Sequence, residues 1–317
     1  MIIPKGMRLY LTENCDASCP WCFNKNTRDP NKDMDTEKCK KLIDYLAEHG
    51  IKKLRIMGGE PTMHPDFVEI WKHSYNKFNN CVVYTNGHFL DKIKEILPYY
   101  MPGKHIINFN FAHLNSFSNP ELFTKLEFIC TEVVIKLDTN PEKLIAKIQK
   151  LNEDARQINL YISFVLTIDC TLNIFKYKKE ILDRLIPILT FAENHQEILW
   201  SWDHKYPKCI LTAEVVQKIG HIKPERTPIT LHPCYSLAGC SGLITSNFKL
   251  VHCNQYQHNK LDLFTETDNL VPFKTLCNFL TFEGYHKLES LRNTSCASCF
   301  YFGTQCTGGC VAHKFEH

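Results

Sequence analysis

The sequence predicts an α/β fold that is built on a parallel sheet and followed by a smaller cysteine-rich region. Apolar, strand-like runs alternate with helical patterns from residue 8 to about residue 203. The 317 residues, 44% of them apolar, are enough for one large domain and a smaller one. Cysteines become frequent after residue 230. We therefore expect a first domain over residues 1–205, then a linker and a cysteine-rich domain over residues 206–317.

The expected strands are short apolar runs separated by turn residues. They are Met7–Leu11, Lys53–Met57, Cys81–Thr85, His105–Phe111, Glu132–Leu137, Asn159–Thr167 and Ile198–Trp202. The stretches between them have helical periodicity. They are Thr36–His49, Pro65–Phe78, Leu90–Leu97, Glu121–Cys130, Glu142–Asn152 and Phe175–Ala192. In the first of these we expect Thr36 to cap the first turn and Gly50 to end the last. An α/β sheet of this kind places its functional site at the carboxyl ends of its strands.

Composition excludes several classes of partner. A net charge of +3 and a pI near 8.1 are too mild for a nucleic-acid-binding surface. No apolar run in the sequence reaches membrane-spanning length, and Met1-Ile2-Ile3-Pro4 lacks the pattern of a signal peptide. We therefore expect a cytoplasmic protein that binds neither nucleic acid nor membrane. Sixteen cysteines in such a chain indicate metal sites rather than disulfides.

Three of these cysteines form the motif Cys15-x-x-x-Cys19-x-x-Cys22, directly after the first expected strand. Three thiolates this close together can hold one iron–sulfur cluster and leave one iron without a protein ligand. A zinc site or part of a disulfide set is the alternative for the motif taken alone. A second motif, Gly58-Gly59-Glu60-Pro61, follows the next expected strand. Both motifs therefore lie where an α/β sheet would place a functional site.

Together the two motifs resemble those of the radical S-adenosylmethionine (radical SAM) enzymes, and Trp21 stands in the aromatic position usual before the third cysteine. The resemblance implies a partial (β/α)6 barrel and a [4Fe-4S] cluster on the three cysteines, with SAM bound to the open iron. One electron then cleaves the SAM sulfonium to a 5'-deoxyadenosyl radical. In this resemblance the Gly58-Gly59-Glu60-Pro61 segment holds the cofactor's amino group through backbone atoms and the carboxylate.

Two further strand ends resemble cofactor contacts of the superfamily. Thr85-Asn86-Gly87 closes the third expected strand, where related enzymes often carry this triplet near the adenosyl group. A plain turn is the alternative, because Asn-Gly is a strong turn dipeptide. Asn108 and Asn110, on the fourth strand, lie where many relatives place a serine that contacts the cofactor.

The cysteines after residue 230 resemble the SPASM extension, which adds auxiliary [4Fe-4S] clusters to radical SAM enzymes that mostly modify peptides and proteins. The resemblance implies one cluster on Cys234, Cys240, Cys253 and Cys310, and a second on Cys296, Cys299 and Cys306. A structural zinc knuckle on the last four of these cysteines is the alternative. It would leave Cys234, Cys240 and Cys253 without a role.

The chain departs from the SPASM pattern at three places. The gap between Cys299 and Cys306 is one residue longer than usual, and Phe248 occupies a position that is usually glycine. No further cysteine follows to complete the second auxiliary cluster. Its last iron would be open to substrate or bound by a different side chain, or the cluster would not assemble. The candidate ligands are His313, His317 and Cys277.

Candidate catalytic residues follow the last expected strand. Asp203 and His204 could contact substrate or relay a proton, since strand ends in barrels line the site. Cys209 could donate a hydrogen atom to a substrate radical, as in peptide epimerases of the superfamily. The alternative for Cys209 is packing, as for other buried thiols.

The resemblance implies a radical SAM enzyme that acts on a ribosomally made peptide, by crosslinking, epimerisation or two-electron oxidation. Auxiliary clusters would relay electrons, and a flavodoxin or ferredoxin would be the electron donor. Asn254 stands where sulfatase-maturating relatives carry an acidic base, which weighs against oxidation by their route.

Two other functions stay open. A small-molecule dehydrogenase or mutase of the same superfamily is the first, because the cysteine motif begins at residue 15 and leaves no space upstream for a peptide-recognition module. The second is a non-catalytic iron–sulfur or zinc scaffold, for which Gly58-Gly59-Glu60 would have to be a coincidence.

Overall fold

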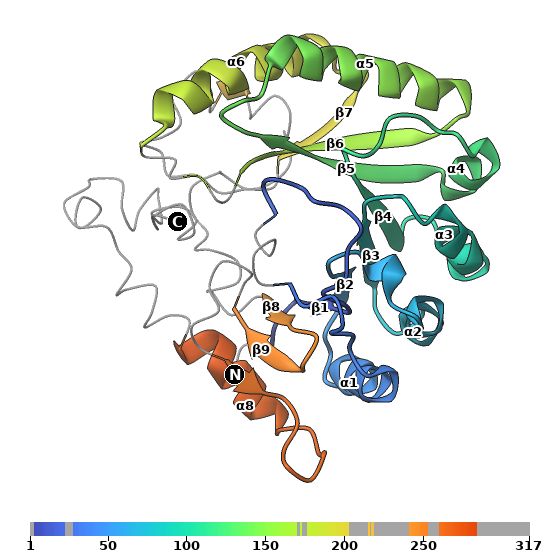
Figure 1. Ribbon diagram of the computed structural model, residues 1–317, viewed down its shortest axis with the longest axis vertical. Coiled ribbons are helices and arrows are strands. Elements are labelled where there is room, and N and C mark those ends of the chain that lie inside the picture. The colour runs from blue at the N-terminus through green and yellow to red at the C-terminus, as the bar shows by residue number, and fades with distance from the viewer. Residues whose placement is uncertain are drawn as a thin grey trace. The chain divides into compact units, whose positions relative to one another are not determined.

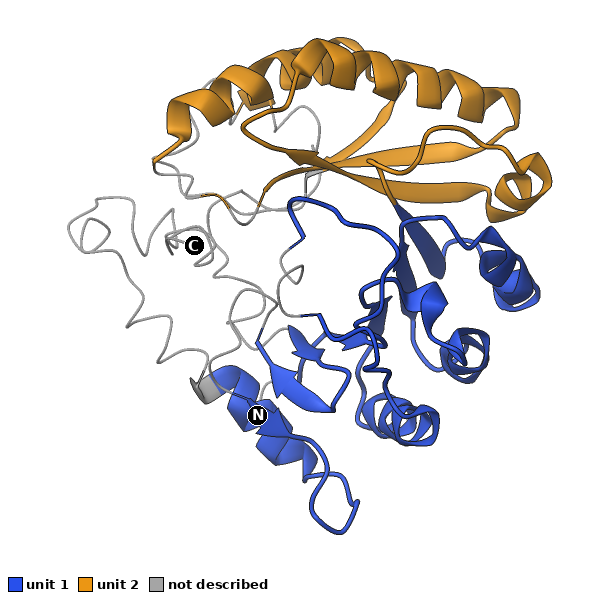
Figure 2. Ribbon diagram, viewed as in Figure 1, with its two compact units in different colours: residues 1–109, 235–290 blue, residues 110–234, 291–317 orange. Residues whose placement is uncertain are grey.

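The computed structural model describes residues 3–22, 28–169, 172, 176–202, 215, 217–218, 241–252 and 260–283 (Figure 1). The chain divides into two compact units, of residues 1–109 with 235–290 and of residues 110–234 with 291–317 (Figure 2). Each unit is described by itself. In the described part of the chain, no helix has the length and apolarity needed to cross a membrane.

The first unit contains a sheet of parallel strands with helices between them. The strands β1 (Gly6–Tyr10), β2 (Lys53–Met57), β3 (Asn80–Thr85) and β4 (His105–Asn110) pair in this order. The helices α1 (Thr36–Glu48), α2 (Phe67–Ser74) and α3 (Leu90–Ile96) lie along one side of these strands (Figure 1). Short 3-10 turns, η1 (Pro61–Met63) and η2 (Leu97–Tyr99), complete the connections.

The core of this unit follows from strand register. Leu9 pairs with Ile56, Ile56 with Val83, and Val83 with Ile107. All four side chains are fully buried, so one apolar row crosses four strands. Fully burying an aliphatic side chain of this size contributes about 1.5–3 kcal/mol.

The segment after residue 240 joins the same sheet. Strand β8 (Ser241–Ile244) runs parallel to β1, and β9 (Lys249–Val251) and β10 (Leu261–Asp262) continue the sheet as antiparallel strands. Helix α8 (Phe273–Asn278) and the π-helix η3 (Phe279–Glu283) follow. The described part of the predicted extension is thus built into the N-terminal unit through β8.

The second unit repeats the same alternation. Strands β5 (Phe128–Ile135), β6 (Tyr161–Ile168) and β7 (Leu199–Trp202) are parallel. Helix α4 (Pro120–Leu126) precedes β5, and α5 (Pro141–Gln157) and α6 (Lys178–Asn194) lie side by side over the strands (Figure 1). The predicted α/β class with a parallel sheet is therefore confirmed.

Several predicted element bounds differ from the structure, and two of the differences have a clear local cause. The helix expected over Glu121–Cys130 ends at Leu126, because Glu127 takes a left-handed φ of 58°, and strand β5 begins at once. The expected cap Thr36 is instead the first helical residue. Asp35 caps α1, its carboxylate accepting from Lys38 N at 2.8 Å, and Thr36 donates to Asp66. Gly50, at φ 85°, follows the last turn as expected.

Candidate cluster and cofactor site

The two N-terminal motifs meet through their backbones at the carboxyl ends of β1 and β2. Gly59 N donates to Thr12 O at 2.7 Å, and Glu60 N donates to Asn14 O at 2.7 Å. A Cβ atom on Gly59 would lie 2.2 Å from Asn14 O, and one on Gly58 would lie 2.7 Å from Thr12 O. Both glycines are therefore required by the close approach of two backbones.

The three cysteines of the first motif are half-buried thiols in the loop that follows. Burial raises the pKa of Cys15, and Arg28 opposes that rise. Burial also raises the pKa of Cys19, and the charges of Cys22 and Cys15 raise it further. Cys22 N also donates to Cys19 O at 3.0 Å.

These residues fit an iron–sulfur cluster by their chemistry. Thiols that raise one another's pKa are stabilised as thiolates when a cation binds between them. In the described part of the chain, no three Cys, His, Asp or Glu side chains are gathered closely enough to hold a single metal ion. A cluster is larger than one ion, so its thiolates lie further apart than the ligands of a zinc site.

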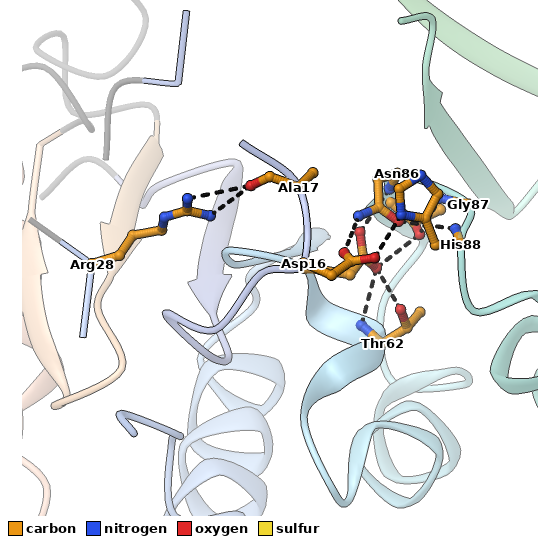
Figure 3. A network of polar contacts seen from close by, with 9 residues as sticks. Asp16, Ala17, Arg28, Thr62, Asn86, Gly87 and His88 are labelled. Carbon is orange, nitrogen blue, oxygen red and sulfur yellow. Dashed lines mark hydrogen bonds and ion pairs between the residues drawn. The ribbon is translucent and has the colours of Figure 1, made fainter. Parts of the chain in front are cut away.

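The cysteine loop is held by side chains on both sides of it. The Arg28 guanidinium donates twice to Ala17 O, at 3.2 and 3.3 Å (Figure 3). The Glu13 carboxylate accepts from Asp29 N at 3.0 Å and from Ser246 Oγ at 2.8 Å. Because Ser246 lies in the turn between β8 and β9, Glu13 joins the loop to that hairpin.

Glu60 is the centre of a buried hydrogen-bond network. Its side chain is 1% exposed. Oε1 accepts from Thr62 N (3.2 Å), Thr62 Oγ1 (2.5 Å) and Thr85 Oγ1 (2.8 Å), and Oε2 accepts from Asn86 N (2.6 Å). Burial raises the pKa of the Glu60 carboxyl, and these donors oppose that rise. These four hydrogen bonds fix the position of the Glu60 carboxylate.

Thr85-Asn86-Gly87 is a tight turn that also reaches the cysteine loop. Gly87 takes a φ of 80°, and its N–H donates to Thr85 Oγ1 at 3.0 Å. The Asn86 side chain donates to Asp16 Oδ1 at 2.7 Å, and His88 Nδ1 lies 2.6 Å from Asp16 Oδ2 (Figure 3). The two interpretations of this triplet, a turn and a part of the site, are thus compatible.

The other predicted cofactor contacts lie at strand ends. Asn108 is buried near the end of β4. Asn110 ends that strand, and its Oδ1 accepts from Ala112 N at 3.0 Å. Pro61 is buried at the first position of η1. The proposed cofactor contacts of these residues stay predictions.

Several predicted site residues lie outside the described residues. They are Asp203, His204, Cys209, Cys234, Cys240, Cys253, Cys296, Cys299, Cys306 and Cys310, together with the candidate ligands His313 and His317. Cys277, the third candidate ligand, is described. It is fully buried in α8, and burial raises its pKa.

Other cysteines pack in the core, as expected of buried free thiols. Cys39 and Cys81 are fully buried. Burial raises the pKa of each to about 12, and that of the half-buried Cys130 to about 11. Inert thiols of this kind are distinct from those of the cysteine loop.

The sequence-based reasoning missed Glu13, Asp16, Arg28 and His88. Of these four residues, only Asp16 has a local signal in the sequence, because it is a carboxylate that lies between the candidate ligands Cys15 and Cys19. The contacts of the other three residues depend on chain segments that only the fold brings together.

Comparisons with known proteins agree with this geometry. Residues 9–153 match the model of the radical SAM superfamily. A segment is 36% identical over 85 residues to the PqqA peptide cyclase of Bradyrhizobium diazoefficiens, covering 26% of this chain and 21% of that protein. Another match, 31% identical over 92 residues, is to a probable GTP 3',8-cyclase of Pyrococcus abyssi, covering 29% of this chain and 30% of that protein. The chain thus matches less than a third of the length of either relative.

Two solved structures share the fold over nearly the whole chain. Streptococcus suis SuiB bound to its precursor peptide SuiA has a TM-score of 0.66 at 15% identity, covering 98% of this chain and 72% of SuiB. The protein anSMEcpe with bound AdoMet has a TM-score of 0.61 at 18% identity, covering 97% of this chain and 89% of that one. The superfamily model covers the cysteine loop, strand β2 and the Gly-Gly-Glu segment, and this part of the chain is therefore similar in sequence to the radical SAM superfamily.

Proposed function

We propose that this protein is a radical SAM enzyme that cleaves SAM reductively to a 5'-deoxyadenosyl radical and takes a hydrogen atom from a ribosomally synthesised peptide. The observation that carries the proposal is the backbone contact between the two motifs, in which Gly59 N and Glu60 N donate to the carbonyls of Thr12 and Asn14. This contact sets the Gly-Gly-Glu segment beside the loop of the three thiols.

In this proposal Cys15, Cys19 and Cys22 hold a [4Fe-4S] cluster and leave one iron open to SAM. When bound, the cluster and SAM supply the electron transfer and the radical. The chain's own residues bind and orient them. The residues assigned to SAM are Gly58, Gly59, Glu60, Pro61, Thr85, Asn86, Asn108 and Asn110. The raised pKa values of Cys15 and Cys19 mean that iron must displace protons, so cluster assembly is favoured as pH rises.

Two similarities support a peptide substrate. SuiB, solved with a precursor peptide, resembles this chain in fold, and the similarity covers 98% of this chain and 72% of SuiB. The PqqA peptide cyclase shares 36% identity over 85 residues. We assign Cys234, Cys240, Cys253 and Cys310 to one auxiliary cluster and Cys296, Cys299 and Cys306 to a second. A flavodoxin or ferredoxin is the proposed electron donor.

Catalytic residues for the peptide step are proposed from the sequence. Cys209 is the candidate hydrogen-atom donor, and Asp203 and His204 are candidate substrate contacts or proton carriers. If the reaction is an epimerisation, the substrate radical of a Cys209→Ala variant should take a hydrogen atom back from 5'-deoxyadenosine, so that less of the inverted product forms. A Cys209→Ala variant with unchanged product would remove this residue from the mechanism.

A small-molecule substrate is the second candidate. Several GTP 3',8-cyclases match this chain at similar identity and length to the peptide cyclase. The two candidates share the proposed radical chemistry and differ in the molecule that loses hydrogen.

The first experiment tests the radical chemistry. Protein reconstituted anaerobically with iron and sulfide is incubated with SAM and dithionite, and 5'-deoxyadenosine is measured by liquid chromatography. The wild type should form it and Cys19→Ala should not. Cys39→Ala is the matched control, since Cys39 is buried in α1 and belongs to neither cysteine group. No product from the wild type, or equal product from Cys19→Ala, would reject the proposal and favour a non-catalytic scaffold.

The second experiment separates the substrates. A synthetic precursor peptide, with SuiA as the first one tried, and GTP are each added to the same assay, and mass spectrometry follows the added molecule. A peptide mass change, coupled to 5'-deoxyadenosine formation, supports peptide modification. Conversion of GTP with an unchanged peptide would replace it with the small-molecule function.

A further inference from the structure

The Asp16 carboxylate bridges two segments that are remote in sequence. It lies between Cys15 and Cys19, and it contacts Asn86 Nδ2 at 2.7 Å and His88 Nδ1 at 2.6 Å (Figure 3). Since β2 lies between β1 and β3 in the sheet, this bridge crosses the end of β2, where the Gly-Gly-Glu segment begins. The bridge therefore connects the cysteine loop to the far side of the site.

The receiving turn is itself held in place. Asn86 Oδ1 accepts from His88 N at 2.9 Å, which leaves the Asn86 amide nitrogen to face Asp16. The same turn is bound to the buried Glu60 through Thr85 Oγ1 and Asn86 N. A chain of hydrogen bonds thus runs from Asp16 through Asn86 to Glu60, and each member limits the position of the next.

We propose that Asp16 is a positioning residue that fixes the cysteine loop relative to the Thr85–His88 turn, and so sets the geometry in which SAM reaches both. The inference rests on the proposed function, which assigns the loop to the cluster and the turn to SAM. Asp16 acts through its neighbours and touches no reacting atom.

The test uses two substitutions and a matched control. Asp16→Ala removes both contacts, whereas Asp16→Asn keeps an acceptor for Asn86 and offers an amide N–H to His88 without the charge. Asp44→Ala is the control, because Asp44, on α1, also holds a histidine, with Oδ1 3.0 Å from His73 Nε2. Iron and sulfide content, SAM affinity and the electron paramagnetic resonance spectrum of the reduced cluster are measured for each.

Asp16→Ala should keep the iron content of the wild type, bind SAM about tenfold more weakly and lose much of the spectral change on SAM addition. Asp16→Asn should bind SAM within about threefold of the wild type, and Asp44→Ala should match the wild type. In the protein without iron, hydrogen exchange of a peptide over residues 10–22 should be faster in Asp16→Ala, with α1 unchanged.

Three results would overturn the inference: wild-type SAM affinity and spectrum in Asp16→Ala, unchanged exchange of the 10–22 peptide, or loss of iron from Asp16→Ala. The last would mean that Asp16 serves cluster assembly instead. Failure of the proposed function is recognised separately, because the wild type would then bind no iron or form no 5'-deoxyadenosine.

Discussion

The carbonyl oxygen of Asn14 faces Gly59 so closely that a Cβ atom there would lie 2.2 Å from it. Backbone atoms cannot move aside as the end of a flexible side chain can. The approach is reinforced by the hydrogen bond from Glu60 N to Asn14 O, at 2.7 Å. The cysteine loop and the Gly-Gly-Glu segment can therefore approach this closely only because Gly59 has no side chain.

Gly59→Ala should separate these two segments. We expect the free energy of unfolding to fall by about 3 kcal/mol, as for severe overpacking, and the loop to lose its cluster. Urea unfolding and iron content check this. Gly103→Ala is the control, because Gly103 has a φ of 78° and its Cβ would meet none of the described residues within 4 Å. It should lose about 1 kcal/mol through backbone strain alone and keep its iron.

Phe248 adopts a conformation that glycine prefers. Its φ is 59°, in the turn between β8 and β9, where the SPASM pattern usually has glycine. Its ring packs edge-on against Phe264, with centroids 5.1 Å apart. Phe248→Gly should be more stable than Phe248→Ala by about 1 kcal/mol, because both lose the ring and only alanine keeps the strain.

Urea unfolding of both variants measures this difference. The same pair of substitutions at Phe264 is the control, and there glycine should be the less stable residue. Equal free energies of unfolding for the two variants at residue 248 would show that a left-handed φ does not destabilise alanine at this turn.

The buried His105 should make stability depend on pH. Its Nε2 lies 2.7 Å from Tyr75 O and must donate, and its Nδ1 accepts from Met101 N at 2.8 Å, so the ring is neutral. Burial lowers its pKa from 6.5. The unfolded chain therefore binds a proton at a higher pH than the folded one, and stability is retained above about pH 6.5 and falls as pH decreases below it.

Comparison of wild type and His105→Gln at pH 7.5 and 5.5 checks this. The wild type should lose about 1 kcal/mol more than the variant over this interval, since one pKa unit corresponds to about 1.4 kcal/mol. Glutamine can still donate to Tyr75 O but does not titrate. An equal loss of stability in both proteins would show that a group other than His105 causes the loss at low pH.

Local patterns were sufficient to predict which residues meet at the site. Both motifs directly follow apolar strand runs, and neighbouring parallel strands end at one edge of a sheet, so Cys15 and Gly59 had to lie close together. The end of α1 was also predictable, because Gly50 alone at that point favours a positive φ.

Contacts between distant segments were not predictable in this way. Nothing local in Ser241–Ile244 indicates that β8 pairs with β1, or that Ser246 would reach Glu13 across 233 residues. The early end of α4 was missed because Glu127 carries no glycine-like signal for its left-handed φ. Asp35 and Thr36 are both acceptable caps by residue type, and only the geometry of α1 selects Asp35.

Iron content tests the predicted extension. Protein reconstituted anaerobically should hold about twelve irons per chain if Cys15, Cys234 and Cys296 belong to three separate clusters. The last cluster then has an open iron or takes its fourth ligand from outside the Cys296, Cys299 and Cys306 group. Cys277 is a poor source of that ligand, because it is fully buried in α8 and burial raises its pKa.

Cys296→Ala then separates the alternatives. If the three-cluster assignment is correct, the Cys296→Ala variant should lose about four irons. It should still cleave SAM in the absence of substrate, because its N-terminal cluster is unchanged. About eight irons in the wild type, without zinc, would mean that the Cys296 group assembles no cluster. About four irons with one zinc, lost in Cys296→Ala, would replace the auxiliary clusters with a structural zinc knuckle. That outcome would also strengthen the small-molecule function, since the SPASM resemblance is one of the observations that connect this chain to peptide-modifying enzymes.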